Sequence, residues 1–508
     1  MDLIHIKTLG QLRAAGYQPV SIKEEMRRNL IYKIEHNEPR FQGILGYDAT
    51  VLKDIETAIL SRHNILLLGL RGQAKTRIAR QLVELLDEYI PIIAGSEIND
   101  DPFNPVSIYG RQLVEKMGDD TPVSFLHRLE RFGEKLATPD VSVADLIGDI
   151  DPIKAANLRL SFSDEEVIHY GIIPRCNRSL FVINELPDLQ ARIQVALFNI
   201  LQEGDIQIRG FKLRLNLDIL FVFTANPEDY TSRGSIVTPL KDRIESQILT
   251  HYPKDLNTAL SITEQEAAIL DDQKQRVQLP ELLKKIVEQI AFEARNSEYV
   301  DAKSGVSARL TIAALENLVS SAERRLLVNK ERSTTVWISD LMGIIPAITG
   351  KIELVYEGEQ EGPFQVALHL LEKAIRSQFV QYFPRPAKRT PTGKPSMEGR
   401  DLNPYRKITS WFDKGGSLDI LSEVKDKERF LLLDKVDGLS EIVLSHYPDT
   451  PKNEQYLLME FILHGLAAYS LISKKIVEGK IEFNDLIGSM MDLGLSMDED
   501  DEADEEDI

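Results

Sequence analysis

A short glycine-containing loop at residues 69–76 constrains the fold of this chain more than any other feature. Its sequence, GLRGQAKT, follows the apolar run NILLLG at 64–69 and precedes the helix-like run RIARQLVELL at 77–86. A strand, such a loop and then a helix correspond to the pattern G-x-x-x-x-G-K-[ST] with one replacement. In this arrangement the backbone N–H groups of the loop and the helix start bind phosphate groups. The sequence therefore predicts an α/β unit built around a phosphate-binding loop.

The residues of this loop are suited to a nucleotide with Mg²⁺. Lys75 is placed to reach the outer phosphates, and the hydroxyl of Thr76 is placed to ligate Mg²⁺. Ala74 stands where the pattern has its last glycine, a replacement that is sterically tolerable if φ is negative there. The residues expected to contact the nucleotide are Gly69, Leu70, Arg71, Gly72, Gln73, Ala74, Lys75 and Thr76.

Two further apolar runs end in polar residues that suit the same chemistry. The run LFVINE at 180–185 ends in Asn184 and Glu185. A phosphate-binding loop works with a carboxylate that holds Mg²⁺ and often with a Glu that activates water. Glu185 fits the second role, whereas Asn184 occupies the metal position with an amide oxygen and no charge. The run ILFVFT at 219–224 leads to Asn226, which can orient water or touch the γ-phosphate, although Asn-Pro by itself is also a common turn.

The same runs predict the fold class. Near-continuous apolar strands are typical of a parallel sheet buried on both faces, and their alternation with helical patterns indicates an α/β P-loop core flanked by helices. The segment IQIRGFKLRLNL at 206–217 alternates like a hairpin, with Gly210 near the turn. Beyond residue 253 we expect helices only, one of them opened by Pro280, as far as residue 382.

Changes in composition divide the rest of the chain. The stretch 384–400 contains four prolines, two glycines and five basic residues, which predicts an extended linker. Nine acidic residues lie between 498 and 507, and their mutual repulsion predicts an unfolded tail. The expected organisation is an N-terminal helical segment at 1–40, the nucleotide-binding core at 41–253, a helical lid at 254–383, a Pro-rich basic linker at 384–404, a small helical C-terminal module at 405–491 and a disordered acidic tail at 492–508.

Two arginines gain significance only from the order of the motifs. Arg243 lies in PLKDRI and Arg309 in GVSAR, and either of them alone is typical of a surface charge. Other short segments occur in a fixed order with the loop and the strands: FQGILGY at 41–47, DLIGD at 145–149, GIIPR at 171–175 and LQEG at 201–204. Over about residues 41–382 this order and spacing resemble the AAA+ ATPases, and within them the MoxR and magnesium-chelatase ATPase-subunit group, whose loop commonly ends in Ala-Lys-Thr.

The resemblance implies roles and an assembly. It makes Asn226 the sensor 1 residue, Arg243 the arginine finger that completes the site of a neighbouring subunit, and Arg309 the sensor 2 residue of the lid. At Asn184 the chain departs from the family pattern, which has Asp. The resemblance further implies ATP hydrolysis by a homo-oligomer, a hexameric ring, that remodels or activates a partner protein as a MoxR-like chaperone or a chelatase-type motor does. In this group the partner is often a von Willebrand factor A-domain protein.

Two other function classes stay open. Because Asn184 contributes no charge, the chain can instead be a nucleotide-gated assembly scaffold with weak hydrolysis. Related AAA+ cores also occur in DNA-dependent remodellers and transcription activators. The net charge of −20 and the lack of a helix-turn-helix module with a basic recognition face argue against a nucleic-acid partner.

Composition excludes several further site types. The single cysteine, Cys176, permits no intrachain disulfide and no cysteine-based zinc site. The apolar stretch 457–472 is interrupted by Glu460 and His464 and is too short to cross a bilayer, so it predicts a buried helix. The N-terminus has neither the basic start nor the apolar run of a signal peptide. These features predict a cytoplasmic, multidomain protein, and they do not specify its protein substrate or any role in porphyrin metallation.

Overall fold

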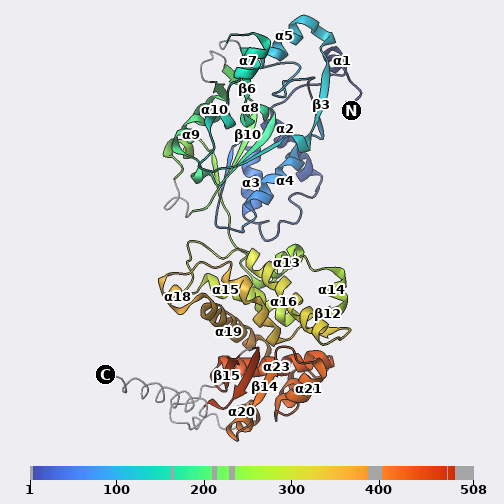
Figure 1. Cartoon of the computed structure of the whole chain (residues 1–508). Coiled ribbons are helices and arrows are strands. Elements are labelled where there is room, and N and C mark those ends of the chain that lie inside the picture. The colour runs from blue at the N-terminus through green and yellow to red at the C-terminus, as the bar shows by residue number, and fades with distance from the viewer. Residues whose placement is uncertain are drawn as a thin grey trace, which may run out of the picture. The chain divides into compact units, whose positions relative to one another are not determined.

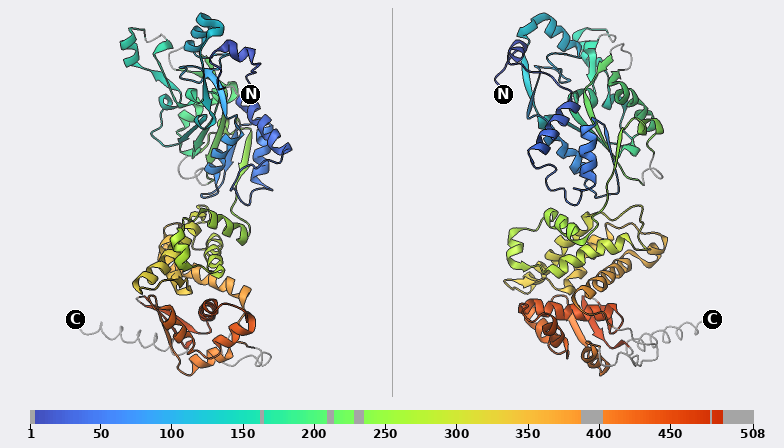
Figure 2. Two further views of the ribbon diagram at one scale, coloured as in Figure 1. Left: turned by 90° about the vertical axis from the view of Figure 1, so that its right-hand side faces the viewer. Right: turned by 180° about the vertical axis from the view of Figure 1, so that it is seen from behind.

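The computed structural model describes residues 4–161, 165–208, 214–227, 235–386, 403–477 and 479–486. The chain forms two compact units, Met1–Tyr252 and Pro253–Ile508 (Figures 1 and 2). The linker at 384–404 and the acidic tail at 492–508 fall largely or wholly outside the described residues. No described helix combines the length and the apolar character needed to cross a membrane.

A five-stranded sheet forms the centre of the first unit. Its strand order is β11 (Ser246–Leu249), β1 (Ile65–Leu68), β10 (Ile219–Ala225), β7 (Ser179–Asn184) and β4 (Phe132–Leu136). All four neighbouring pairs are parallel. Every residue of β1, β7 and β10 is buried, as expected of central strands covered on both faces. The α/β fold class predicted from the sequence is confirmed.

Two hydrophobic cores cover the two faces of this sheet. On one face, Ile65, Val182 and Val222 pack against α2 (Ile22–Glu35), α3 (Val51–Leu60) and α4 (Lys75–Gln81). On the other face, the alternate strand residues pack against α8 (Ile172–Arg175), α9 (Ala191–Ala196) and α10 (Phe198–Glu203). Because successive side chains of a strand point to opposite faces, one continuous apolar run supplies both cores.

The N-terminal helix α2 is fastened to the sheet by polar contacts as well as by packing. Glu25 receives two hydrogen bonds from the guanidinium of Arg131, at 2.6 and 2.7 Å, and both side chains are almost completely buried. The carboxylate of Asp218 accepts a hydrogen bond from the backbone N–H of Ile22 at the helix start, at 2.8 Å. Helix α2 is therefore an integral part of the first unit.

Smaller antiparallel pairs complete the first unit. They are β2 (Tyr89–Ile93) with β3 (Val123–His127), β5 (Gly148–Ile150) with β6 (Ile168–Tyr170), and β8 (Asp205–Gln207) with β9 (Arg214–Asn216). The last pair is the hairpin expected at 206–217, and Gly210, expected near its turn, lies outside the described residues. Further short helices in this unit include α1 (Leu9–Ala14), α5 (Ile108–Met117), α6 (Val143–Leu146), α7 (Pro152–Leu158) and α12 (Thr238–Lys241).

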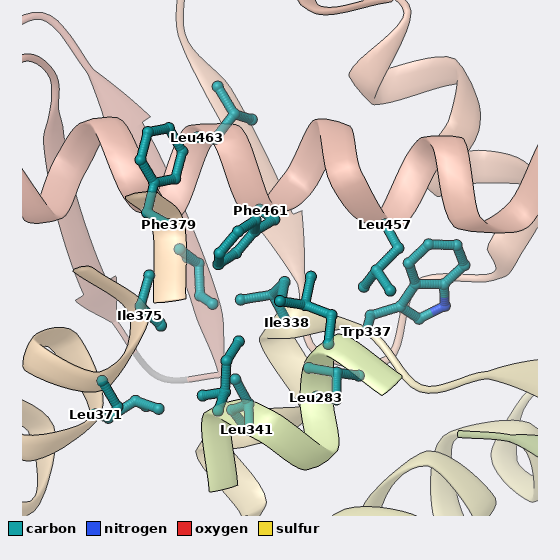
Figure 3. Close-up of a cluster of buried hydrophobic side chains, with 14 of the residues drawn as sticks. Leu283, Trp337, Ile338, Leu341, Leu371, Ile375, Phe379, Leu457, Phe461 and Leu463 are labelled. Atoms are coloured by element: carbon teal, nitrogen blue, oxygen red, sulfur yellow. The ribbon is translucent and has the colours of Figure 1, made fainter. Parts of the chain in front are cut away.

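The second unit is mainly helical. Its main helices are α13 (Leu256–Glu266), α14 (Asp271–Arg276), α15 (Glu281–Arg295), α16 (Arg309–Val328), α17 (Ile345–Thr349), α18 (Tyr356–Glu361), α19 (Pro363–Tyr382), α20 (Arg406–Asp413), α21 (Asp426–Leu433), α22 (Leu439–His446) and α23 (Lys452–Ala468). One hydrophobic core joins the helices on both sides of the linker, as the packing of Phe379 and Phe461 shows (Figure 3). Helix α23 confirms the buried helix predicted from the apolar stretch at 457–472.

The expectation of helices only beyond residue 253 is wrong. A parallel pair joins β12 (Val277–Gln278) to β13 (Thr334–Thr335), and an antiparallel sheet has the order β14 (Leu418–Leu421), β16 (Lys480–Asn484), β15 (Ser473–Val477). The segment KKIVEGKIEF at 474–483 alternates apolar and polar residues around Gly479, which is a hairpin pattern. Its short strands pack one apolar face, including Ile481 and Phe483, on the helical core.

Candidate functional site

The phosphate-binding loop lies between β1 and α4, and its first residue has room only for glycine. A Cβ atom on Gly69 would lie 1.9 Å from Thr250 Oγ1 and 2.3 Å from Gln73 Oε1. The backbone N–H of Gly69 donates to the carbonyl of Ala225 at 3.1 Å, which ties the loop to the end of β10. Gly72 has a φ of 72°, a conformation that glycine adopts readily. The two glycines thus set the shape of the loop.

Ala74 corrects one expectation. Its φ is 57° and its ψ is 13°, so it lies in the left-handed region rather than at the negative φ under which Ala was expected to be tolerable. An L-residue other than glycine pays about 1–2 kcal/mol for this conformation. Ala74 is the residue immediately before α4. The loop has the backbone conformation that glycine adopts readily at this position, and the Cβ atom of Ala74 strains it.

Lys75, at the start of α4, forms one hydrogen-bonded chain with two residues that directly follow β10 and β7. Lys75 is 8% exposed, and its ammonium donates to the carbonyls of Gly69 and Leu70 and, at 2.8 Å, to Asn226 Oδ1. The amide of Asn226 in turn donates to Glu185 Oε2 at 2.8 Å. Carboxyl ends of parallel strands meet at one edge of a sheet, so β1, β10 and β7 bring these groups together.

The side chain of Asn184 is hydrogen-bonded on both sides. Its Nδ2 donates to Glu134 Oε1 on β4 at 2.6 Å, and its Oδ1 accepts from Thr224 Oγ1 on β10 at 3.1 Å. Glu134 Oε2 accepts from Arg80 of α4 at 2.9 and 3.0 Å. Sequence reasoning missed Glu134, because β4 has the mixed sequence FGEKL and only the pairing with β7 reveals its position.

The segment that ends the first unit also holds the phosphate-binding loop. Thr250 Oγ1 donates to Gln73 Oε1 at 2.6 Å, and the hydroxyl of Tyr252 donates to the carbonyl of Arg71 at 2.9 Å. The hydroxyl of Tyr47 lies within hydrogen-bond reach of the carbonyls of Gln73 and His251, at 3.1 and 2.6 Å, and burial raises the pKa of Tyr47 to about 12. The segment FQGILGY at 41–47 is thereby placed against the loop.

The donor set at this edge fits Mg²⁺ held jointly with phosphates. Thr76, in the first turn of α4, and Asn184 offer neutral oxygens, and Glu185 and Glu134 offer carboxylates. Mg²⁺ prefers oxygen ligands and is usually bound through few protein groups together with phosphates and water. Among the described residues, no group of three or more His, Cys, Asp or Glu could hold a metal ion by itself.

The two arginines expected at the site belong to different units. Arg243 follows α12, where its guanidinium donates to the carbonyl of Pro239 at 2.8 Å and to Gln202 at 3.1 Å, and it lies 5.1 Å from the ring centre of Phe198. Arg309 belongs to the second unit, where it is exposed at the first position of α16.

Comparison with known proteins gives only distant likenesses. No family model and no curated protein matches the chain. A putative ATPase from Cytophaga hutchinsonii is 18% identical with a TM-score of 0.29, over 72% of this chain and 98% of that one. A structure of the complex between the BchI and BchD subunits of magnesium chelatase is 19% identical with a TM-score of 0.32, over 63% of this chain and 98% of that one. NtrX from Brucella abortus in complex with ATP is 14% identical with a TM-score of 0.37, over 65% of this chain and 62% of that one. At such values the functional interpretation rests on the geometry of the site.

Proposed function

We propose that the protein is an AAA+ ring ATPase of the MoxR and magnesium-chelatase type. It binds ATP with Mg²⁺, hydrolyses the γ-phosphate bond and uses the cycle to remodel or activate a partner protein. The observation that carries this proposal is the chain Lys75–Asn226–Glu185, which links a cation of the phosphate-binding loop, an amide and a carboxylate at one edge of a parallel sheet.

Each member of the chain has a distinct task. Lys75 exchanges its contact with Asn226 for the outer phosphates of the nucleotide, because an ammonium binds an anionic oxygen more strongly than a neutral one. Asn226 and Glu185 orient and polarise the attacking water. Thr76 and Asn184 are the residues that would hold Mg²⁺, which when bound neutralises charge on the phosphates.

Arg243 and Arg309 are assigned to assembly and coupling. Arg243 is held at the end of α12 by Pro239 and Phe198, and we assign it to the nucleotide of a neighbouring subunit. An active site completed in this way exists only in a homo-oligomer, for which we propose a hexameric ring. Arg309 is assigned to the lid, a von Willebrand factor A-domain protein is the proposed partner, and the proposed location is the cytoplasm.

A second candidate is a nucleotide-gated assembly scaffold with weak hydrolysis. Asn184 is uncharged, and its amide is hydrogen-bonded to Glu134 and Thr224. These features favour a protein that binds ATP but hydrolyses it slowly. Phosphate release at saturating Mg²⁺ separates the two candidates. Steady turnover supports the motor, and tight binding without turnover supports the scaffold.

The test compares Lys75→Ala, Glu185→Gln and a control, Lys116→Ala, which removes an exposed lysine of α5. Lys75→Ala is expected to lose ATP binding, and Glu185→Gln to bind ATP without hydrolysing it. Binding is measured by calorimetric titration and turnover by phosphate release, with the melting temperature as the check on folding. Unchanged binding and turnover in Lys75→Ala would contradict the proposal, and Lys116→Ala should behave as the wild type.

A further inference from the structure

Asn184 and Glu134 form a pair across neighbouring strands. In the parallel register, Glu134 lies opposite Val182 and Leu136 lies opposite Asn184. Residues two apart on a strand share a face, so the side chains of Glu134 and Asn184 lie on the same face of the sheet and meet diagonally. The amide nitrogen of Asn184 and the carboxylate oxygen of Glu134 are 2.6 Å apart.

This contact sets the orientation of the Asn184 amide. An ionised carboxylate only accepts hydrogen bonds, so the NH₂ group must face Glu134 and the oxygen must face the other way. That oxygen accepts from Thr224 Oγ1 at 3.1 Å, and Thr224 Oγ1 accepts from the backbone N–H of Glu185 at 3.2 Å. The chain of hydrogen bonds therefore runs from Glu134 to the backbone of the candidate catalytic Glu185.

The same contact explains why residue 184 is an amide. An Asp at this position would bring two carboxylates to the 2.6 Å that now separates the two side chains, which forces one of them to bind a proton. Strand β4 thus already provides the negative charge that position 184 lacks. Arg80 contacts the other oxygen of Glu134, but its side chain is 63% exposed against 23% for Glu134, so water screens the arginine more strongly.

We propose that Glu134 is the acidic group of the Mg²⁺ site. It acts from β4 through Asn184, whose amide it orients. Glu134 is thus a positioning residue: it orients the Asn184 amide and adds a negative charge behind it. The inference rests on the proposed nucleotide-binding function. Its consequence is reciprocal: neither side chain can be changed alone without penalty, whereas exchanging both preserves one carboxylate and one amide.

The experiment is a double-mutant cycle read by metal binding. Binding of Mn²⁺, as the probe, to the protein–ADP complex is measured by electron paramagnetic resonance for the wild type, Glu134→Gln, Asn184→Asp and the double variant. ADP affinity without metal is measured in parallel, and thermal melting checks folding. We expect Glu134→Gln to weaken Mn²⁺ binding by about tenfold, the usual scale for a group behind a metal ligand, with metal-free ADP affinity unchanged.

The double variant decides the proposal. Asn184→Asp alone should not tighten Mn²⁺ binding, because the new carboxylate faces that of Glu134. For Glu134→Gln with Asn184→Asp, the Mn²⁺ affinity should return to within about threefold of the wild-type value. Additive effects of the two substitutions would overturn the pairing. If the wild type binds ADP and Mn²⁺ and Glu134→Gln binds Mn²⁺ equally well, this inference alone is overturned. A wild type that binds no nucleotide would overturn the proposed function and the inference together.

Arg80→Ala is the matched control, since it removes the contact to the other oxygen of Glu134 and leaves that to Asn184. If Glu134 serves the metal site, Arg80→Ala keeps Mn²⁺ affinity or strengthens it. If Glu134 is only an ion-pair partner that holds α4 to β4, Arg80→Ala weakens Mn²⁺ binding as much as Glu134→Gln does, and the proposal fails.

Discussion

The two compact units differ in where their buried cations lie. In the first unit, Lys75 is buried at the edge of the sheet and donates to two carbonyls and an amide oxygen. In the second, Arg325 and Arg429 are buried in the core and donate to carboxylates, Arg325 to Asp340 and Asp426 and Arg429 to Glu460. The two arginines are structural elements of a core, whereas Lys75 lies in the phosphate-binding loop at the start of α4, where an ammonium is suited to an anionic ligand.

The first unit also contains a structural pair, Glu25 with Arg131, which is buried and fastens α2. It lies at the amino ends of the strands and not at their carboxyl ends, because Arg131 comes just before β4 and also donates to the carbonyl of Arg178, just before β7. Position in the fold therefore separates the two uses of a buried cation. Charges of the site should change activity with little effect on stability, and charges of the cores should do the reverse.

Arg243 offers the largest effect on activity. An arginine finger is worth about 10³–10⁵ in rate in phosphoryl transfer, so Arg243→Ala should bind ATP nearly normally and hydrolyse it very slowly, with an almost unchanged melting temperature. If it acts across a subunit boundary, mixing Arg243→Ala with Glu185→Gln rebuilds interfaces that hold both intact residues. Phosphate release is measured while one variant is titrated into the other at constant total protein. If phosphate release does not recover at any ratio of the two variants, Arg243 does not act across subunits.

Arg429 offers the largest effect on stability. It is completely buried, donates to Glu460 Oε2 at 3.0 Å and to Ser339 at 2.9 Å, and lies 5.3 Å from the ring centre of Trp337. Arg429→Ala leaves a buried carboxylate without its partner, which costs about 3–5 kcal/mol. Both tryptophans of the chain, Trp337 and Trp411, belong to the second unit, so their fluorescence during urea unfolding reports its stability.

The matched control for Arg429 is Lys407→Ala. Lys407 pairs with Glu441 at 2.5 Å in the same unit, but both side chains are 65% exposed, and such pairs contribute about 0–1 kcal/mol. ATP binding by the folded protein should be unaffected by either substitution. If Arg429→Ala costs no more than Lys407→Ala, the buried pair does not stabilise the core as its geometry indicates.

His464 makes the stability of the second unit depend on pH. It is 4% exposed, neither ring nitrogen has a hydrogen-bond partner among the described residues, and burial lowers its pKa well below the ordinary value. The unfolded chain binds a proton below about pH 6.5, whereas the folded chain does not, so stability falls as the pH drops below that point. The slope approaches about 1.4 kcal/mol per pH unit for a single histidine.

His464→Leu should flatten this dependence. The measurement is urea unfolding by tryptophan fluorescence between about pH 7 and 5, a window that includes the ordinary histidine pKa of about 6.5. Glu460, whose oxygen lies 4.0 Å from the ring, is present in both proteins and keeps its own titration. An equal slope for the wild type and His464→Leu would show that the folded protein accommodates a charged His464.

The residues that sequence reasoning located and those it missed differ in burial. Strands β1, β7 and β10 are buried throughout, and their unbroken apolar runs make both the strands and the polar residues that follow them predictable. Strand β4 carries half-exposed polar residues, so its sequence gives no such signal. Because Glu134 lies on β4, its contact with Asn184 depends on a pairing between segments 50 residues apart, which local patterns do not encode.

The smallest predicted effect tests the strain of the backbone at Ala74, in the phosphate-binding loop. Ala74 has a φ of 57°, and glycine has no Cβ to oppose that conformation, so Ala74→Gly should stabilise the first unit by about 1 kcal/mol after the larger entropy of glycine in the unfolded chain is subtracted. Ala58→Gly, in the interior of α3, should instead lose about 1 kcal/mol. Calorimetric melting of the transition that ADP shifts measures both. Opposite signs for the two substitutions show that the loop stores strain at Ala74, and equal losses would refute it.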